Sequence, residues 1–99
     1  MTNWSSRYTD MSFEGGRYDG DTFSGVFVED DFSRASLRRA RLSGSFTNVT
    51  FAEANLEHAD FNGGSFVNTT FRNASVTVAQ LRRARHLAHV IGPTGEDLA

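Results

Sequence analysis

The chain has 99 residues, enough for one small domain, and its hydrophobic content of 38% is low for an ordinary two-layer core. The absence of cysteine excludes disulfide bonds and zinc–thiolate sites and favours a reducing compartment. The net charge of −2 is uneven, because residues 1–31 hold seven acids against two arginines and residues 32–99 hold five acids against eight arginines. Residues 1–10 lack the apolar segment of a signal peptide, and no apolar run could span a bilayer, so we expect a cytoplasmic protein.

The chain opens with a short segment, residues 1–5, whose one large aromatic side chain is Trp4. Trp4 lies one residue outside the periodic pattern that starts at Tyr8. Repetitive folds need caps on their open ends. We therefore expect residues 1–5 to form an N-terminal cap in which Trp4 covers the first repeat.

From residue 6 to residue 77, large apolar side chains recur with a period of five. A strand would show a period of two and a helix a period of 3.6, so the pattern indicates an internal repeat of another kind. Two spacings are four instead, from Phe23 to Phe27 and from Leu42 to Phe46. Most residues two positions before each large side chain are small. The series comprises Tyr8, Phe13, Tyr18, Phe23, Phe27, Phe32, Leu37, Leu42, Phe46, Phe51, Leu56, Phe61, Phe66, Phe71, Val76 and Leu81.

Grouping this series in fours places both short spacings at the same corner of a repeating coil. Each of the four faces then carries one column of side chains that stack from coil to coil. The pattern predicts an all-β solenoid of about four coils over residues 6–77. Its predicted buried core comprises Phe13, Phe23, Phe32, Leu37, Leu42, Phe46, Phe51, Leu56, Phe61, Phe66 and Phe71.

Residues 35–39, 54–58 and 59–63 read Ala-Ser-Leu-Arg-Arg, Ala-Asn-Leu-Glu-His and Ala-Asp-Phe-Asn-Gly. These pentamers resemble the A(D/N)LXX signature of pentapeptide-repeat proteins, and the resemblance extends over about residues 6–81. It implies a right-handed quadrilateral β-helix with no catalytic site. It also implies dimerisation through a C-terminal module, which is frequent in that family. Some members mimic duplex DNA by shape and negative charge, bind a type II topoisomerase such as DNA gyrase and protect it from inhibitors.

Two acids, Asp21 and Asp30, lie at positions where the repeat has mostly small residues. A buried carboxylate without a partner is costly. Three readings are open: a local distortion turns both outward, they accept hydrogen bonds from free backbone N–H groups, or they form a ligand site. We favour the first reading. The register is also open around Phe27, because inward Val26 and Val28 would expose Phe27 as an interface residue.

The columns of polar residues between the faces place opposite charges one coil apart. The same register predicts that Arg34 lies beside Glu53, that Arg41 lies beside Asp60, and that Asp19, Arg38 and Glu57 form an alternating ladder. Pairs of this kind contribute a few tenths of a kcal/mol each. We interpret these arginines as structural.

After residue 77 the pattern changes to that of a helix, predicted over residues 78–91. Thr77 and Gln80 have the spacing of a capping box, and Gly92 followed by Pro93 is a strong stop. The helix is predicted to cap the last coil and to dimerise with its copy, and residues 92–99 are predicted to be a flexible tail. The candidate dimer residues are Leu81, Ala84, Leu87, Ala88, Val90 and Ile91.

The residues contain no phosphate-binding loop, dinucleotide-binding motif or zinc-protease motif, so we expect neither an enzyme nor a cofactor. We predict a non-catalytic interaction module that pairs with itself and with an unidentified protein, and binds neither membranes nor nucleic acid directly. The alternative is a DNA mimic that binds gyrase and confers antibiotic resistance or self-immunity. Its acidic surface would comprise Asp10, Glu14, Asp19, Glu29 and Asp31.

Overall fold

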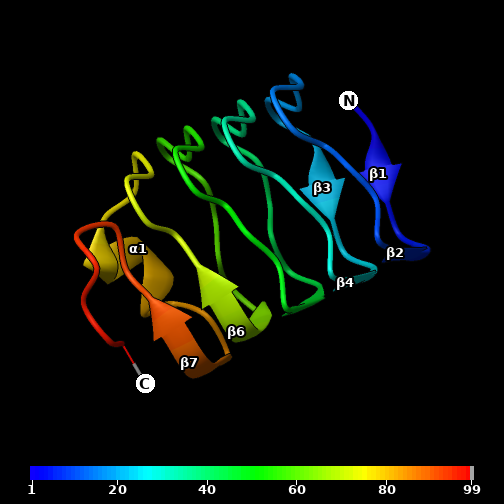
Figure 1. The fold of residues 1–99 in the computed structure, drawn as a ribbon. Coiled ribbons are helices and arrows are strands. Elements are labelled where there is room, and N and C mark those ends of the chain that lie inside the picture. The colour runs from blue at the N-terminus through cyan, green and yellow to red at the C-terminus, as the bar shows by residue number, and fades with distance from the viewer. Residues whose placement is uncertain (99) are drawn as a thin grey trace.

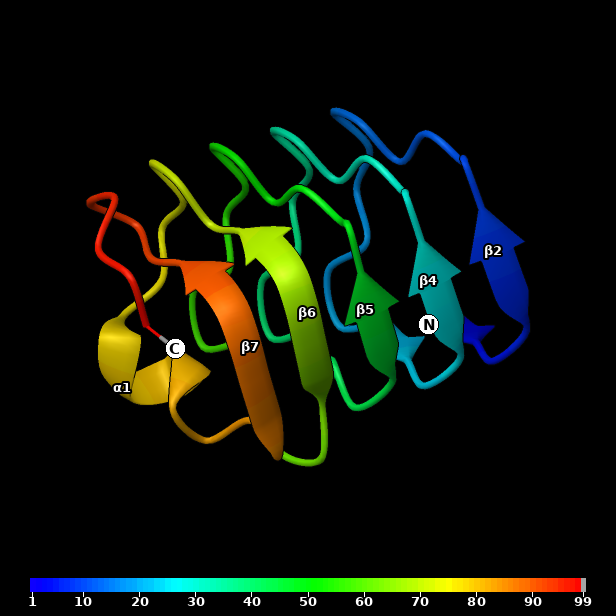
Figure 2. The same cartoon turned by 60° about the horizontal axis from the view of Figure 1, so that its bottom comes forward.

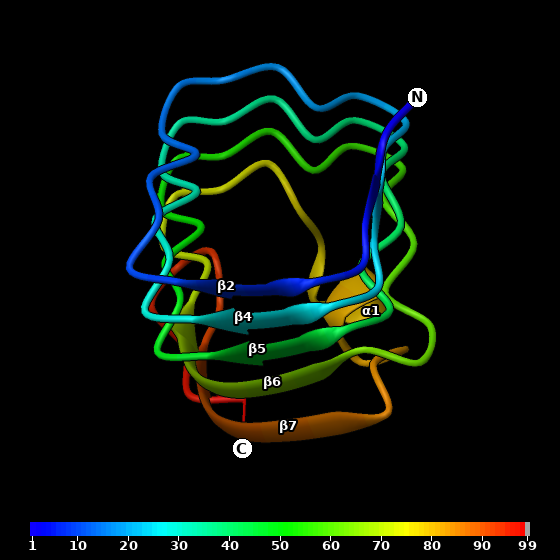
Figure 3. The same ribbon diagram turned by 90° about the vertical axis from the view of Figure 1, so that its right-hand side faces the viewer.

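A computed structural model describes residues 1–98 as a stack of coils with a short helix near the C-terminal end (Figure 1). Seen along the stack, each coil is roughly square (Figure 3). The elements in chain order are β1 (Asn3–Trp4), β2 (Arg7–Thr9), β3 (Thr22–Phe23), β4 (Val26–Val28), β5 (Ser45–Thr47), β6 (Ser65–Thr70), α1 (Val78–Leu81) and β7 (His86–Ile91).

One side of the stack is a five-stranded parallel sheet in the order β2-β4-β5-β6-β7, with one strand from each coil (Figure 2). On a second side β1 pairs with β3, and isolated parallel bridges such as Ser36↔Asn55 continue the same stacking elsewhere. The all-β solenoid is therefore confirmed. It has about five coils, one more than the period of five alone predicted.

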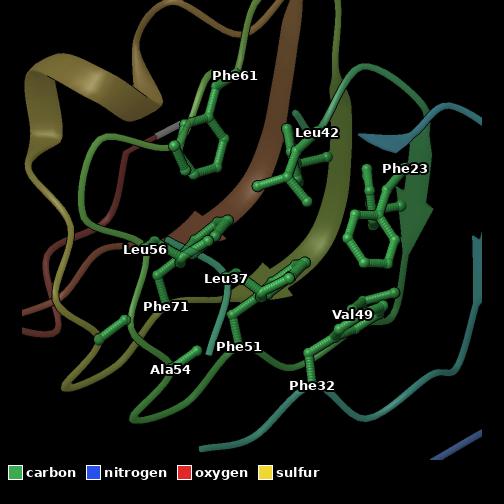
Figure 4. Close-up of a cluster of buried hydrophobic side chains, with 14 of the residues drawn as sticks. Phe23, Phe32, Leu37, Leu42, Val49, Phe51, Ala54, Leu56, Phe61 and Phe71 are labelled. Carbon is green, nitrogen blue, oxygen red and sulfur yellow. The ribbon is translucent and has the colours of Figure 1, made fainter. Parts of the chain in front are cut away.

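The columns of large side chains predicted from the sequence run through the interior. On the face that carries the sheet, Phe27, Phe46 and Phe66 stack with ring centroids 4.8 Å apart at each step. On the next face, Phe32 and Phe51 stack at 5.0 Å, and the close-up in Figure 4 shows Phe71 continuing that column. All eleven residues of the predicted core are buried. Because Phe27 is fully buried, the reading that exposes it is wrong.

Glycine lets successive backbones pass closely at one corner of the coils. At this corner successive backbones approach so closely that a Cβ on Gly44 would collide with the carbonyl oxygen of Gly25. A Cβ on Gly25 would collide in the same way with the carbonyl oxygen of Ser6. Glycine fits such an approach because it has no Cβ. A Cβ on Gly64 would meet Leu42 O in the same way, although the step from Phe61 to Phe66 is five.

Trp4 does not lie outside the repeat, as the sequence suggested. It pairs with Phe23 across β1 and β3, and the two rings are stacked 5.9 Å apart at an interplanar angle of 3°. Its spacing of four from Tyr8 is the same short step that recurs at Phe23 and Leu42. Trp4 also makes edge contacts with the first-coil rings of Tyr8, Phe13 and Tyr18, so this added member of the column packs over the first coil.

The predicted helix over residues 78–91 is wrong beyond Leu81. The capping box forms as expected, since the Thr77 side chain accepts from Gln80 N at 3.1 Å and the Gln80 side chain accepts from Thr77 N at 3.0 Å. The helix nevertheless ends after one turn, and residues 86–91 form β7. The open edge of β6 offers six residues of backbone hydrogen-bonding partners, which outweighs a helical pattern in the sequence.

The segment predicted as a flexible tail folds back under the last coil. Gly92 N donates to Glu96 O at 2.8 Å, and Leu98 N donates to Val90 O at 2.9 Å. Leu98 is buried and belongs to the hydrophobic core. Residues 92–98 therefore cover part of the C-terminal end of the stack, while residue 99 lies outside the described part of the chain.

Candidate interaction surfaces

Asp21 and Asp30 are buried, and Asp21 joins the N-terminal residues to the first coil while Asp30 joins the first coil to the second. Asp21 accepts from Thr2 N at 3.0 Å and from Trp4 Nε1 at 3.2 Å. Asp30 accepts from Met11 N at 2.8 Å. Both carboxyl groups are buried, so the reading that turned them outward is wrong, and the reading in which they bind free backbone N–H groups is the one the structure supports.

The second oxygen of Asp30, Oδ2, is buried and has no hydrogen-bond partner among the described residues. Burial raises the pKa of this carboxyl group above its ordinary value, and the nearby negative charge of Asp10 adds to the rise. The hydrogen bond from Met11 N opposes it. A charged Asp30 next to the core therefore lowers the stability of the folded state.

The five acids predicted as one surface are spread over several corners of the solenoid. Asp10 and Glu29 occupy the same corner in successive coils, both in the left-handed region with φ of 56° and 57°. Asp31 lies two residues further on and accepts from Ser33 N at 2.8 Å. Glu14 and Asp19 follow later faces. Asp10 and Glu29 are thus the stacked pair of exposed acids in this set.

Arginine and hydrogen-bond donors already engage the other two acids. Arg34 lies between Glu14 and Glu53 and forms ion pairs with both, the second at 3.3 Å. The Asp19 carboxylate accepts from Ser36 Oγ at 2.6 Å and from Arg38 N at 3.0 Å, and these bonds lower its pKa. The predicted pairing of Arg34 with Glu53 is present in the structure. Among the five acids, Glu14 is thus in an ion pair, and Asp19 is held by hydrogen bonds from neutral donors.

The candidate dimer residues divide into two groups. Leu81 and Val90 are completely buried: Leu81 belongs to the hydrophobic core, and Val90 pairs with Thr69 across β6 and β7. These two residues belong to the core and leave no surface for a partner. Ala84, Leu87, Ala88 and Ile91 are half-buried at the last coil and remain available for contact.

A groove of about 660 Å³ lies beside α1, where the chain leaves the regular coil path. Its walls come from the corner of the third coil and from the start of α1. Gln80 spans the groove and donates through Nε2 to Leu56 O and Ala59 O, both at 3.1 Å. The groove lining includes His58, Asp60, Asn62, Val76, Thr77 and Arg83. The sequence marked Thr77 and Gln80 as a helix cap and gave no sign of a groove.

Within residues 1–98, no group of three or more His, Asp or Glu side chains is arranged to hold a metal ion. No helix in this part of the chain is long and apolar enough to cross a membrane.

A family model described as pentapeptide repeats matches residues 45–85 in eight copies. Among solved structures, the chain is similar to trypsin-treated QnrB1, described as a plasmid-mediated fluoroquinolone resistance protein, with 16% identity and a TM-score of 0.23. That match covers 75% of this chain and 57% of the QnrB1 chain, so the chain spans little more than half of its length. No curated protein matches the chain.

Proposed function

We propose that the chain, whose residues 45–85 match a model of pentapeptide repeats, is a non-catalytic interaction module that forms homodimers through its last coil. The observation that carries the proposal is the half-buried apolar set Ala84, Leu87, Ala88 and Ile91 at the C-terminal end. Apolar residues left at the end of a solenoid need a cap or a partner.

The edge of β7 supports the same proposal. One edge of β7 pairs with β6 along most of the strand. On the other edge, Leu98 N donates to Val90 O, and Ile91 bridges to Asp97, but both contacts lie at the C-terminal end of the strand. The part of β7 that contains Leu87 thus offers an open edge next to apolar side chains, which is the usual site of strand pairing between chains.

The experiment is the mass of the purified protein by light scattering. The proposal expects twice the 10.9 kDa of a single chain. Leu87→Arg should give the mass of one chain, because a charge would be buried without a partner in the interface. Ser43→Arg adds the same charge at an exposed turn of the middle coils and should leave the dimer intact. A wild-type mass of one chain over the whole concentration range would refute the homodimer, whether or not Leu87→Arg folds.

The second proposal is a DNA mimic that binds a type II topoisomerase. The observation that favours it is the stacked pair of exposed acids, Asp10 and Glu29. A gyrase supercoiling assay with and without a fluoroquinolone tests it directly. Inhibition or protection that disappears in the double variant Asp10→Asn, Glu29→Gln would support mimicry, and no effect of the wild-type protein would exclude it. This role also requires the cytoplasmic location, which stays a prediction.

A further inference from the structure

The groove beside α1 exists because one stretch of coil is missing there. The fourth coil follows the third as far as Ser75, whose amide donates to Ala54 O at 2.9 Å. It rejoins the stack at Arg85, whose amide donates to Gly64 O at 2.8 Å. Between these points the chain forms α1 and the turn after it. On the side away from the second coil, residues 57–62 therefore have no backbone of residues 1–98 running beside them.

The coils above show which hydrogen bonds this edge lacks. In the second coil, Arg39 N donates to Glu57 O at 2.9 Å and Leu42 N donates to Asp60 O at 2.8 Å. The first coil makes the same two bonds to the second, from Gly20 N and Phe23 N. One coil further down, the equivalent donors are the amides of His58 and Phe61. Neither amide has an acceptor among the described residues.

A third bond of the regular pattern is replaced by a side chain. In the second coil, Ala40 O accepts from Asp60 N at 2.8 Å. The equivalent carbonyl in the third coil, Ala59 O, accepts from Gln80 Nε2 at 3.1 Å. Gln80 thus satisfies the acceptor of this edge, and the two donors are left. An edge with free donors and a satisfied acceptor selects a ligand that supplies oxygen atoms.

The charged side chains at the groove also favour a ligand that supplies oxygen atoms. Glu57 is paired with Arg38 at 3.3 Å, and one oxygen of Asp60 accepts from both nitrogens of Asn62. Arg83 lines the groove and has no carboxylate partner within residues 1–98. Arg83 is therefore an arginine of the groove lining without an ion-pair partner among the described residues.

We propose that this groove binds an extended acidic peptide segment of a partner protein along the edge of the third coil, with Gln80 kept on Ala59 O. Two carbonyl groups of the peptide accept from His58 N and Phe61 N, and a carboxylate of the peptide meets Arg83. Ala59 and Val76 supply the apolar part of the lining. The groove is separate from the proposed dimer residues, and the inference does not depend on the dimer.

The chain itself supplies a suitable probe. Residues 57–60 present two carbonyl groups to the second coil in this geometry and carry two acids. A peptide of residues 57–60, flanked by glycine and blocked at both ends, is titrated to millimolar concentration into ¹⁵N-labelled protein. We expect saturable downfield shifts of the His58 and Phe61 amide protons, because a new hydrogen bond deshields the proton. The mass of the sample is measured in parallel, so a failure of the dimer is recognised separately.

Two substitutions and one altered peptide complete the test. Arg83→Gln should weaken binding about two- to fivefold, as expected for loss of an exposed ion pair. Arg82→Gln removes a neighbouring exposed arginine that does not line the groove and should leave the affinity unchanged. A peptide with amides in place of both carboxylates should bind more weakly by a similar factor. Absence of shifts at His58 and Phe61, or equal effects of the two arginine substitutions, would overturn the proposal.

Discussion

Leu87 pairs with Phe66 across β6 and β7 and thereby extends the column Phe27–Phe46–Phe66 into a fifth coil. Leu87, which the sequence pattern placed in a helix, thus occupies the position that phenylalanine holds in the preceding coils. The contact explains why the chain returns to the stack after α1. It also places Leu87 at the end of the core, with one side against Phe66 and the other toward the end of the solenoid.

Leu87→Ala should therefore destabilise the protein, by about 1–3 kcal/mol, somewhat less than a completely buried leucine would cost. Hydrogen exchange should locate the effect in the amides of β7 and leave those of β4 and β5 protected. Ala88→Ser, at the neighbouring position on the opposite side of the strand, should change the free energy of unfolding by much less. Faster exchange spread evenly over all coils after Leu87→Ala would contradict a local role.

Asp30→Asn should remove a pH dependence of stability whose sign is opposite to that contributed by most acids in proteins. Because the pKa of Asp30 is raised in the folded protein, the folded state binds the proton more tightly than the unfolded state does. The contribution of this group to stability is therefore most favourable below its unfolded pKa, near 3.8, and is lost as the pH rises through the raised folded value.

Urea unfolding of the wild-type protein and Asp30→Asn over a pH series measures this difference. The variant should gain stability relative to the wild type as the pH increases from about 4, and the gain should level off above the folded pKa. Asp31→Asn, one residue away and only half-buried, serves as the matched control. A constant difference at every pH would show that Asp30 does not titrate as its burial requires.

Asp21→Ala should loosen the first strand. The substitution removes the acceptor for Thr2 N and Trp4 Nε1, and hydrogen bonds to a charged group contribute about 1.5–3 kcal/mol each. Trp4 is the one tryptophan of the chain, so its fluorescence reports on this strand alone. The emission should shift to longer wavelength as the ring gains contact with water. Asp19→Ala, an exposed acid of the same coil, should leave the emission unchanged.

Arg34→Ala should have a small effect although the arginine contacts two acids. Its side chain and those of Glu14 and Glu53 are all largely exposed. We expect a loss of about 1 kcal/mol or less, which should shrink further at high salt. Thermal unfolding at low and high ionic strength measures both the loss of stability and its dependence on salt. A loss that is large and independent of salt would mean that the stem of Arg34 packs more than it pairs.

Much of the fold follows from the spacing of large side chains, because a column can form only if the same face recurs in every coil. Phe46 and Phe66 illustrate this, since both were placed in the core by period alone. Trp4 was misplaced because a single short step at the start of a series cannot be told from a break in it. Strand β7 could not be predicted from the sequence either, because residues 78–91 fit the pattern of a capped helix. Only the open edge of β6 favours a strand there.

The candidate sites were less accessible to sequence reasoning. Whether Asp30 points inward depends on the position of Met11 N in the coil above it. The open amides of His58 and Phe61 are defined by an absent neighbour, and no pattern of residues records where a chain turns away. The acids Glu14 and Asp19 were correctly expected at the surface, but their partners Arg34 and Ser36 lie about one coil further along the chain.

The central claim is that two copies meet through their last coils, and spin-label distances test it most directly. The chain has no cysteine, so one introduced cysteine carries one label. Labels at His86→Cys, on β7, should give a short distance between copies, and labels at Asp10→Cys should give a much longer one, because the molecule extends 30 Å along its longest axis. No dipolar coupling at position 86, or a shorter distance at position 10, would contradict the account.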